Sequence, residues 1–198
     1  MQVKNAKYID KCNAICQEFR FASSATKAKI SNIYNNHFTG SQLWKIGSKE
    51  YDKVISSYNR SMKIMYDLPW ETHRYFIEPL TGLTHVSNTL LNRYISFIRK
   101  LKTSKKQSVK ELFETACCDV RTTTGHNVRW IMSVHDVYTM DKLLNCSKID
   151  FEYQKIKEED NWKISCLREL LEIREDRMSL SGFENEEIDA LIALICKQ

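Results

Sequence analysis

The amino-acid sequence predicts an all-α protein, with a multi-helix bundle followed by an acidic C-terminal helical hairpin. Two observations lead to this prediction. Only 5 Gly and 2 Pro occur in 198 residues, which are fewer turn-forming residues than a many-stranded β fold needs. Apolar residues also recur at helical spacing through most of the chain, as they do on the buried face of a helix. The hydrophobic fraction of 42% is large enough to build a core.

Residues 1–66 form the first of three predicted segments and are expected to hold three amphipathic helices. Ser23 and Ser24 precede the second helix and Ser48 precedes the third, where a hydroxyl can accept a hydrogen bond from an otherwise unpaired backbone N–H. Leu43 and Trp44, between these two helices, are expected in the core. The three apolar stripes are Tyr8, Ile9, Cys12, Ile15, Cys16 and Phe19; Ile30, Ile33, Tyr34 and Phe38; and Tyr51, Val54, Ile55, Tyr58, Met62 and Met65.

Residues 67–148 form a second, basic helical segment. Pro69 suits the first turn of a short helix, and Pro79 and Gly82 are expected to end that helix. Ser108 and Glu111 have the spacing of a capping box for a later helix. The apolar stripes of the longer helices here are Leu91, Tyr94, Ile95, Ile98 and Leu101; Val109, Leu112, Phe113, Ala116, Cys117 and Val120; and Val128, Ile131 and Val134.

Positive charge is densest between Arg99 and Lys110, where six Lys or Arg occur with no acidic residue before Glu111. Like charges at this density repel one another unless water or a polyanion neutralises them. A solvated helix end and loop accounts for these residues as well as a nucleic-acid contact does. The stretch from Arg121 to Asn127 has two interpretations of equal weight. Its hydroxyls, backbone N–H groups and Arg121 can together hold a phosphate, or a threonine can simply cap a helix.

Residues 149–198 form a third, acidic segment. They contain 7 basic and 13 acidic residues, whereas residues 1–148 contain 23 basic and 12 acidic residues, so the net charge of +5 hides a strong asymmetry. We expect a linker over residues 146–157, with a short extended piece at 149–153. A broadly apolar helix around residues 162–173 then ends near Ser181 and Gly182, and a last helix around residues 188–195 has acidic residues in its first turn. The two helices can pair as a hairpin.

The chemistry of a self-contained enzyme is missing from these residues. There is no Walker loop, HExxH, GxSxG or CxxC motif, and the one close acidic cluster, Glu158–Asp160, has the pattern of a charged helix start. Cys12 and Cys16 are expected to pack in the core, because no further Cys or His donors lie near them in the sequence. Seven irregularly spaced cysteines favour a reducing, intracellular compartment. No apolar run is long enough for a membrane span.

Several pieces of the chain, in the right order, resemble the C-terminal region of reverse transcriptases from non-LTR retrotransposons (LINE-type, of the CR1, L2 and jockey kind). The first part resembles a thumb segment, although Thr39 stands where Tyr is usual and Tyr58 stands where Trp is usual. The pieces are Lys7-Tyr8-Ile9, Phe19-Arg20-Phe21-Ala22, Ile33-Tyr34-Asn35, Thr39-Gly40-Ser41-Gln42-Leu43-Trp44, Tyr58-Asn59-Arg60-Ser61-Met62-Lys63, Leu68-Pro69-Trp70-Glu71-Thr72-His73-Arg74-Tyr75, Leu91-x-Arg93, Phe97, Ser104-Lys105-Lys106, Asp119-Val120-Arg121-Thr122-Thr123-Thr124-Gly125-His126-Asn127, Trp162-Lys163-Ile164, Arg168-Glu169-Leu170, Gly182-Phe183 and Ile195-Cys196.

The resemblance implies a thumb-like segment (1–66), a basic helical region (67–148) and an acidic hairpin (149–198) that together grip RNA or DNA beside an upstream polymerase domain. The catalytic palm, with its Mg²⁺ ions, is not in these residues, so we expect no activity and no cofactor in this chain alone. The Cys/His knuckle of some relatives is also absent, so no zinc is assigned. Whether Met1 begins the protein is left open. The expected backbone contacts are Arg93, Arg99, Lys100, Lys105, Lys106, Arg121 and Arg129, with Thr72, His73 and Arg74 as a second set.

A rival hypothesis is a helical protein-interaction module, namely a decayed or repurposed retroelement remnant without affinity for nucleic acid. For Thr72, His73 and Arg74, a turn held by local hydrogen bonds is an equally good explanation. The salt dependence of nucleic-acid binding separates the two hypotheses, since phosphate contacts weaken steeply as salt rises.

Overall fold

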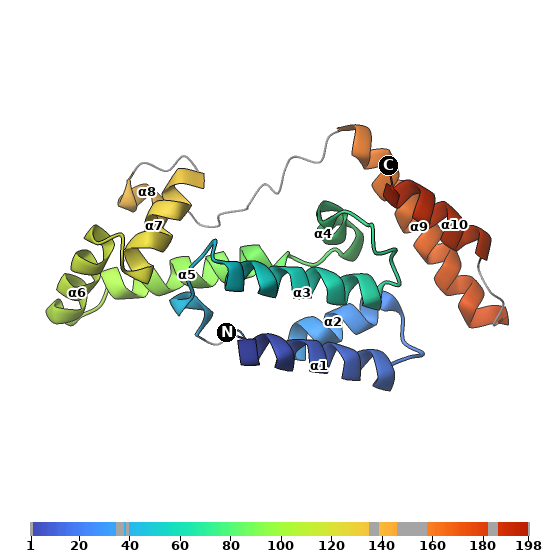
Figure 1. The fold of residues 1–198 in the computed structure, drawn as a ribbon, viewed down its shortest axis with the longest axis horizontal. Coiled ribbons are helices and arrows are strands. Elements are labelled where there is room, and N and C mark those ends of the chain that lie inside the picture. The colour runs from blue at the N-terminus through green and yellow to red at the C-terminus, as the bar shows by residue number, and fades with distance from the viewer. Residues whose placement is uncertain are drawn as a thin grey trace. The chain divides into compact units, whose positions relative to one another are not determined.

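The computed structural model describes residues 2–34, 38, 40–134, 139–145, 158–181 and 186–197, and within these ranges it contains ten α-helices, two 3-10 helices and no strand (Figure 1). The predicted all-α fold is therefore confirmed. The helices are α1 (Gln2–Glu18), α2 (Ser24–Tyr34), η1 (Ser41–Leu43), α3 (Lys49–Met65), η2 (Arg74–Phe76), α4 (Ile77–Thr81), α5 (Val86–Lys102), α6 (Gln107–Cys118), α7 (Thr123–Val134), α8 (Met140–Asn145), α9 (Glu158–Ser181) and α10 (Glu186–Lys197).

The chain divides into two compact units, each assembled from separate stretches of sequence. Unit 1 comprises Met1–Lys4, His37–Ile55 and Val86–Phe151, and unit 2 comprises Asn5–Asn36, Ser56–His85 and Glu152–Gln198. The division into three consecutive segments stays a prediction about the sequence. The predicted linker at 146–157 lies outside the described residues.

In unit 1, helix α5 is the central element, and η1, α6 and α8 each pack against it while α7 packs against α6. The apolar stripe expected on α5 is its buried face, because Leu91, Tyr94, Ile95 and Ile98 are all at most 3% exposed. Phe113 of α6, Val128 and Ile131 of α7 and Leu143 of α8 are also buried, as are Trp44, Ile46, Tyr51 and Val54 in the same unit.

A buried amide ties α7 to the loop between η1 and α3. Asn127 is fully buried, and its Oδ1 accepts a hydrogen bond from the backbone N–H of Ile46 at 2.8 Å while its Nδ2 donates to the carbonyl of Trp44 at 2.7 Å. His126 Nε2 lies 3.1 Å from the carbonyl oxygen of Ile46. In the same unit, the hydroxyl of Tyr94 on α5 donates to the carbonyl of Thr124 on α7 at 3.1 Å. These contacts hold α5, α7 and the 44–47 loop in one fixed arrangement.

In unit 2, α9 and α10 lie side by side as the expected hairpin (Figure 1). Arg174 of α9 is only 4% exposed and links this hairpin to the end of α3. Its guanidinium donates to the carbonyls of Tyr66 at 2.6 Å and Asp67 at 3.0 Å, and to the carboxylate of Asp189 on α10 at 3.1 Å. The carbonyls of the two residues that follow α3 are thus satisfied by a side chain from another element.

Two of the expected helix caps are confirmed and two helix boundaries are corrected. The hydroxyls of Ser23 and Ser48 accept hydrogen bonds from the backbone N–H groups of Thr26 and Tyr51. Ser108 is not a cap, because α6 begins one residue before it. Pro69 opens a turn and no helix, and Pro79 lies within α4, where the first turn does not need its missing N–H.

Several expected core positions lie at the surface instead, and among them Phe19, Val120 and Val134 are 41%, 47% and 48% exposed. Leu43, Ile33 and Leu112 are 67%, 70% and 72% exposed, whereas Trp44 and Phe113, their neighbours in the sequence or in the stripe, are buried. The apolar stripes of η1, α2 and α6 are therefore narrower than their sequence periodicity suggests. Each helix buries only the residues that directly face its neighbour.

Candidate nucleic-acid interface

The stretch from Arg99 to Lys110, here called the basic turn, joins the last turn of α5 to the first turn of α6. Lys100, Lys105 and Lys106 are exposed, and within the described part of the chain none of these three forms an ion pair. The nearest acidic residue in the sequence, Glu111, accepts a hydrogen bond from Gln107 at 3.1 Å. Three of the predicted phosphate contacts are therefore exposed on one short segment.

Two other cations of the basic turn hold α8 in place. The Arg99 side chain is half-buried and its Nε donates to the carbonyl of Leu144 at 2.5 Å. Lys102 Nζ lies 2.5 Å from a carboxylate oxygen of Asp141. The hydroxyl of Thr103 donates back to the carbonyl of Arg99, which completes the end of α5. Arg99, a predicted phosphate contact, is thus already committed to a protein contact.

The helix dipole favours positive charge at one end of the basic turn and disfavours it at the other. Arg99, Lys100 and Lys102 are in the last turn of α5, where the negative end of the helix dipole favours positive charge. Lys106 and Lys110 are at the start of α6, which has no acidic residue in its first turn and no side-chain hydrogen bond at its N-cap, Lys106. Positive charge is unfavourable there, and a bound anion would remove that penalty.

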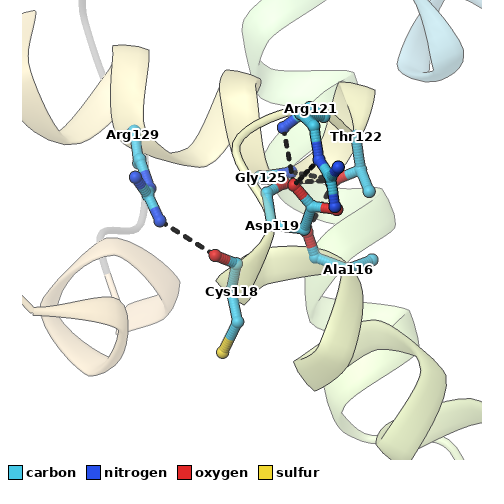
Figure 2. Close-up of polar contacts among 7 residues, drawn as sticks. All are labelled: Ala116, Cys118, Asp119, Arg121, Thr122, Gly125 and Arg129. Carbon is cyan, nitrogen blue, oxygen red and sulfur yellow. Dashed lines mark hydrogen bonds and ion pairs between the residues drawn. The ribbon is translucent and has the colours of Figure 1, made fainter.

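The connection between α6 and α7 is held together by local hydrogen bonds (Figure 2). The hydroxyl of Thr122 donates to the carbonyls of Ala116 and Asp119 at 2.6 and 2.8 Å, and it accepts a hydrogen bond from the N–H of Gly125 at 2.9 Å. Thr122 is therefore the cap of α7. Gly125 is buried, and a Cβ on this residue would lie 2.2 Å from the carbonyl oxygen of Asp119. Only glycine allows the two helix ends to approach this closely.

The two arginines of this connection have partners on the protein (Figure 2). Arg121 forms a two-pronged pair with the Asp119 carboxylate, with nitrogen–oxygen distances of 3.0 to 3.3 Å. Side-chain and backbone hydrogen bonds from Arg121 lower the pKa of Asp119, and the same side-chain bond raises the pKa of Arg121. Arg129 donates to the carbonyl of Cys118 at 2.9 Å, yet its side chain is exposed. Arg93 on α5 is half-buried and also has a partner.

The second predicted set, Thr72, His73 and Arg74, belongs to unit 2. Thr72 is 1% exposed, and its hydroxyl donates to the carbonyl of Pro69 at 2.7 Å and contacts Cys196 Sγ at 3.2 Å. The expectation that Thr72 contacts a nucleic-acid strand is therefore corrected, because its side chain is used to close a turn. His73 and Arg74 are exposed, and the His73 ring stacks on the ring of Tyr75.

An exposed aromatic residue in unit 2 was missed by the sequence analysis. Trp70 is 59% exposed and has two cations of α3 beside its ring, Arg60 at 5.2 Å and Lys63 at 5.7 Å from the ring centroid. The sequence carries one sign of this arrangement, since basic residues one helical turn apart precede a Pro-Trp pair at a helix end. Nothing in the periodicity shows that the tryptophan points outward.

No family model, curated protein or solved structure matches this chain. Among the described residues, no three His, Cys, Asp or Glu side chains are grouped so that they could hold a metal ion. None of the described helices combines the length and the apolar character that crossing a membrane requires.

Proposed function

We propose that this chain binds nucleic acid through the sugar-phosphate backbone, with the basic turn as the principal contact. The observation that supports the proposal most is the joint exposure of Lys100, Lys105 and Lys106, which have no ion pair within the described residues. Backbone contacts of this kind carry no base specificity and depend strongly on salt.

The rigid surroundings of the basic turn add to this proposal. Arg99 and Lys102 fix α8 to the end of α5, and the hydroxyl of Ser104 accepts the N–H of Lys106 at 3.2 Å. Lys105 and Lys106 thus project from a backbone that is already ordered. The protein therefore loses less conformational entropy when it binds a nucleic-acid strand. Arg129 and Arg121 are second in importance, because each must share its hydrogen bonds with a protein partner.

The finer form of the proposal rests on the sequence resemblance. We propose that the chain acts as the thumb and C-terminal part of a non-LTR reverse transcriptase, where it contacts template, primer or target DNA beside a catalytic domain supplied elsewhere. The coding sequence upstream of Met1 tests this form, because an in-frame palm with adjacent aspartates is expected. If the intact gene encodes no such palm, only the general proposal of backbone binding would remain.

A binding assay tests the general proposal. Exchange of Lys105 and Lys106 for Glu should weaken binding to RNA and to DNA of any sequence, since both lysines meet phosphates and not bases. The matched control exchanges Lys45 and Lys49 for Glu, because these lysines are also exposed, lie in the same unit and change the net charge equally. If both variants lost the same affinity, the loss would be explained by the change in net charge alone.

The rival function, a helical protein-interaction module, is favoured by a specific observation. Exposed large apolar side chains are present in both units, including Leu112 on α6, Trp162 on α9 and Leu194 on α10. A chain of this kind would have no measurable affinity for RNA or DNA at low salt. That result would favour the protein-interaction module over nucleic-acid binding.

A further inference from the structure

The turn that follows α3 in unit 2 presents a tryptophan to solvent while burying Leu68 and Thr72, two residues before it and two residues after it. Leu68 is 7% exposed and its N–H donates to the carbonyl of Lys63 at 2.8 Å. Thr72 is 1% exposed, and both its N–H and its hydroxyl donate to the carbonyl of Pro69, at 3.1 and 2.7 Å. Trp70, between these two anchors, is 59% exposed.

The position of the indole is fixed by α3 and not by the core. Lys63 Nζ donates to the carbonyl of Trp70 at 2.7 Å, and the ammonium lies 5.7 Å from the centre of the indole ring. The guanidinium of Arg60, one helical turn earlier, lies 5.2 Å from the same centre. Burial lowers the pKa of Lys63 from its ordinary value, and the nearby Cys196 and Glu71 oppose that shift.

This combination is poorly explained by stability alone. An exposed cation–π contact contributes little to stability, whereas burying a tryptophan side chain is worth several times more. A large apolar ring held outward by a rigid turn, with two cations beside it, instead matches the arrangement by which proteins bind single-stranded nucleic acid. There, an aromatic face stacks on a base and neighbouring cations bind the flanking phosphates.

We propose that Trp70 is a stacking platform for an unpaired base of single-stranded RNA or DNA, and that Arg60 and Lys63 bind the phosphates beside that base. The proposal rests on the nucleic-acid-binding function and deepens it, because it assigns single strands to the Trp70 surface of unit 2. The exposed Arg74 and the stacked rings of His73 and Tyr75 follow in the same stretch of chain. Glu71 is the one acidic residue between Trp70 and Tyr75.

The test compares three probes of equal length by fluorescence anisotropy at low salt: oligo(dT), a strand of abasic sites, and a DNA duplex. The abasic strand carries the phosphates without the bases, so it isolates stacking from charge. Wild-type protein should bind oligo(dT) roughly tenfold more tightly than the abasic strand. Trp70→Ala should lose that preference and keep its affinity for the duplex, whereas Trp70→Phe should retain most of the preference.

Trp162→Ala is the matched control, since Trp162 is a tryptophan of the same unit with 52% of its surface exposed. Its removal should leave all three affinities unchanged. If the wild type does not distinguish oligo(dT) from the abasic strand, or if both tryptophan variants lose the same affinity, the stacking platform is refuted while backbone binding stands. If the wild type binds none of the three probes, the proposed function fails and the platform fails with it.

Discussion

Asn127 of α7 accepts the backbone N–H of Ile46 at 2.8 Å, across 81 residues of sequence. The same side chain donates to the carbonyl of Trp44 at 2.7 Å, so a single amide satisfies one backbone donor and one backbone acceptor of two buried loop residues. A buried backbone group without a partner costs about 1–3 kcal/mol. The arrangement of η1, α7 and the loop that precedes α3 therefore depends strongly on this residue.

Asn127→Ala should lower the free energy of unfolding by about 3 kcal/mol, since two buried backbone groups lose their partners. Urea denaturation measures this change. Asn145→Ala, at an exposed position at the end of α8 in the same unit, is the control and should change the free energy by less than about 0.5 kcal/mol. If the two substitutions lowered the free energy of unfolding equally, the hydrogen bonds of Asn127 would make no particular contribution to stability.

Gly125→Ala should destabilise the protein by about 2–3 kcal/mol, although alanine normally favours a helix over glycine. The added Cβ would lie 2.2 Å from the carbonyl oxygen of Asp119 and 2.7 Å from that of Ala116, and both are backbone atoms that cannot move independently. Gly82→Ala offers a contrast, because there the Cβ meets nothing within 4 Å and the cost comes only from φ of +63°. A stabilised Gly125→Ala protein would contradict the close approach of α6 and α7.

Arg174→Met should cost about 3 kcal/mol, because the buried carbonyl of Tyr66 and the part-buried carbonyl of Asp67 would lose their donor. Asp189→Asn should cost less than about 1 kcal/mol, since the side chain of Asp189 is 54% exposed and water can replace its partner. Thermal unfolding of the two variants separates these contributions. If Asp189→Asn proved as harmful as Arg174→Met, the ion pair and not the carbonyl contacts would hold the hairpin to α3.

Stability should fall on acidification because of His85, which is 2% exposed. Burial, with a smaller contribution from the nearby Arg74, lowers the pKa of His85 to about 4. The unfolded chain, with a pKa near 6.5, takes up the proton first, so the folded state loses stability as pH falls below about 6.5 and loses no more below about 4. At pH 5 the loss is about 2 kcal/mol.

The groups around His85 define the control for this pH dependence. His85 Nε2 lies 2.9 Å from Asn59 Oδ1, its ring meets that of Tyr58 edge to face, and its backbone N–H donates to the carboxylate of Glu78. His85→Gln removes the titrating ring and should flatten the curve of unfolding free energy between pH 7 and pH 5. A variant that keeps the full wild-type slope would assign the pH dependence to another group.

The helices of this protein could be predicted from the sequence because helical periodicity and caps are local signals. Ser48 and the stripe of α5 are examples, and both are confirmed. The partners of the charged residues could not be predicted, because they come from distant segments. Arg99 meets Leu144 and Arg174 meets Tyr66, and no local pattern encodes either pairing. The bond from Thr72 to Pro69 is local and was one of the two alternatives, but the contact of Thr72 with Cys196, 124 residues away, could not be predicted.

The salt dependence of binding to duplex DNA is the most direct test of the central claim that Lys105 and Lys106 contact phosphates. Each phosphate contact contributes about −0.9 to the slope of log affinity against log salt. Exchanging both lysines for Gln should therefore reduce the magnitude of the wild-type slope by about 1.8, while Lys45→Gln with Lys49→Gln leaves it unchanged. An unchanged slope in the Lys105 and Lys106 variant, or no binding by the wild type at low salt, would contradict the claim.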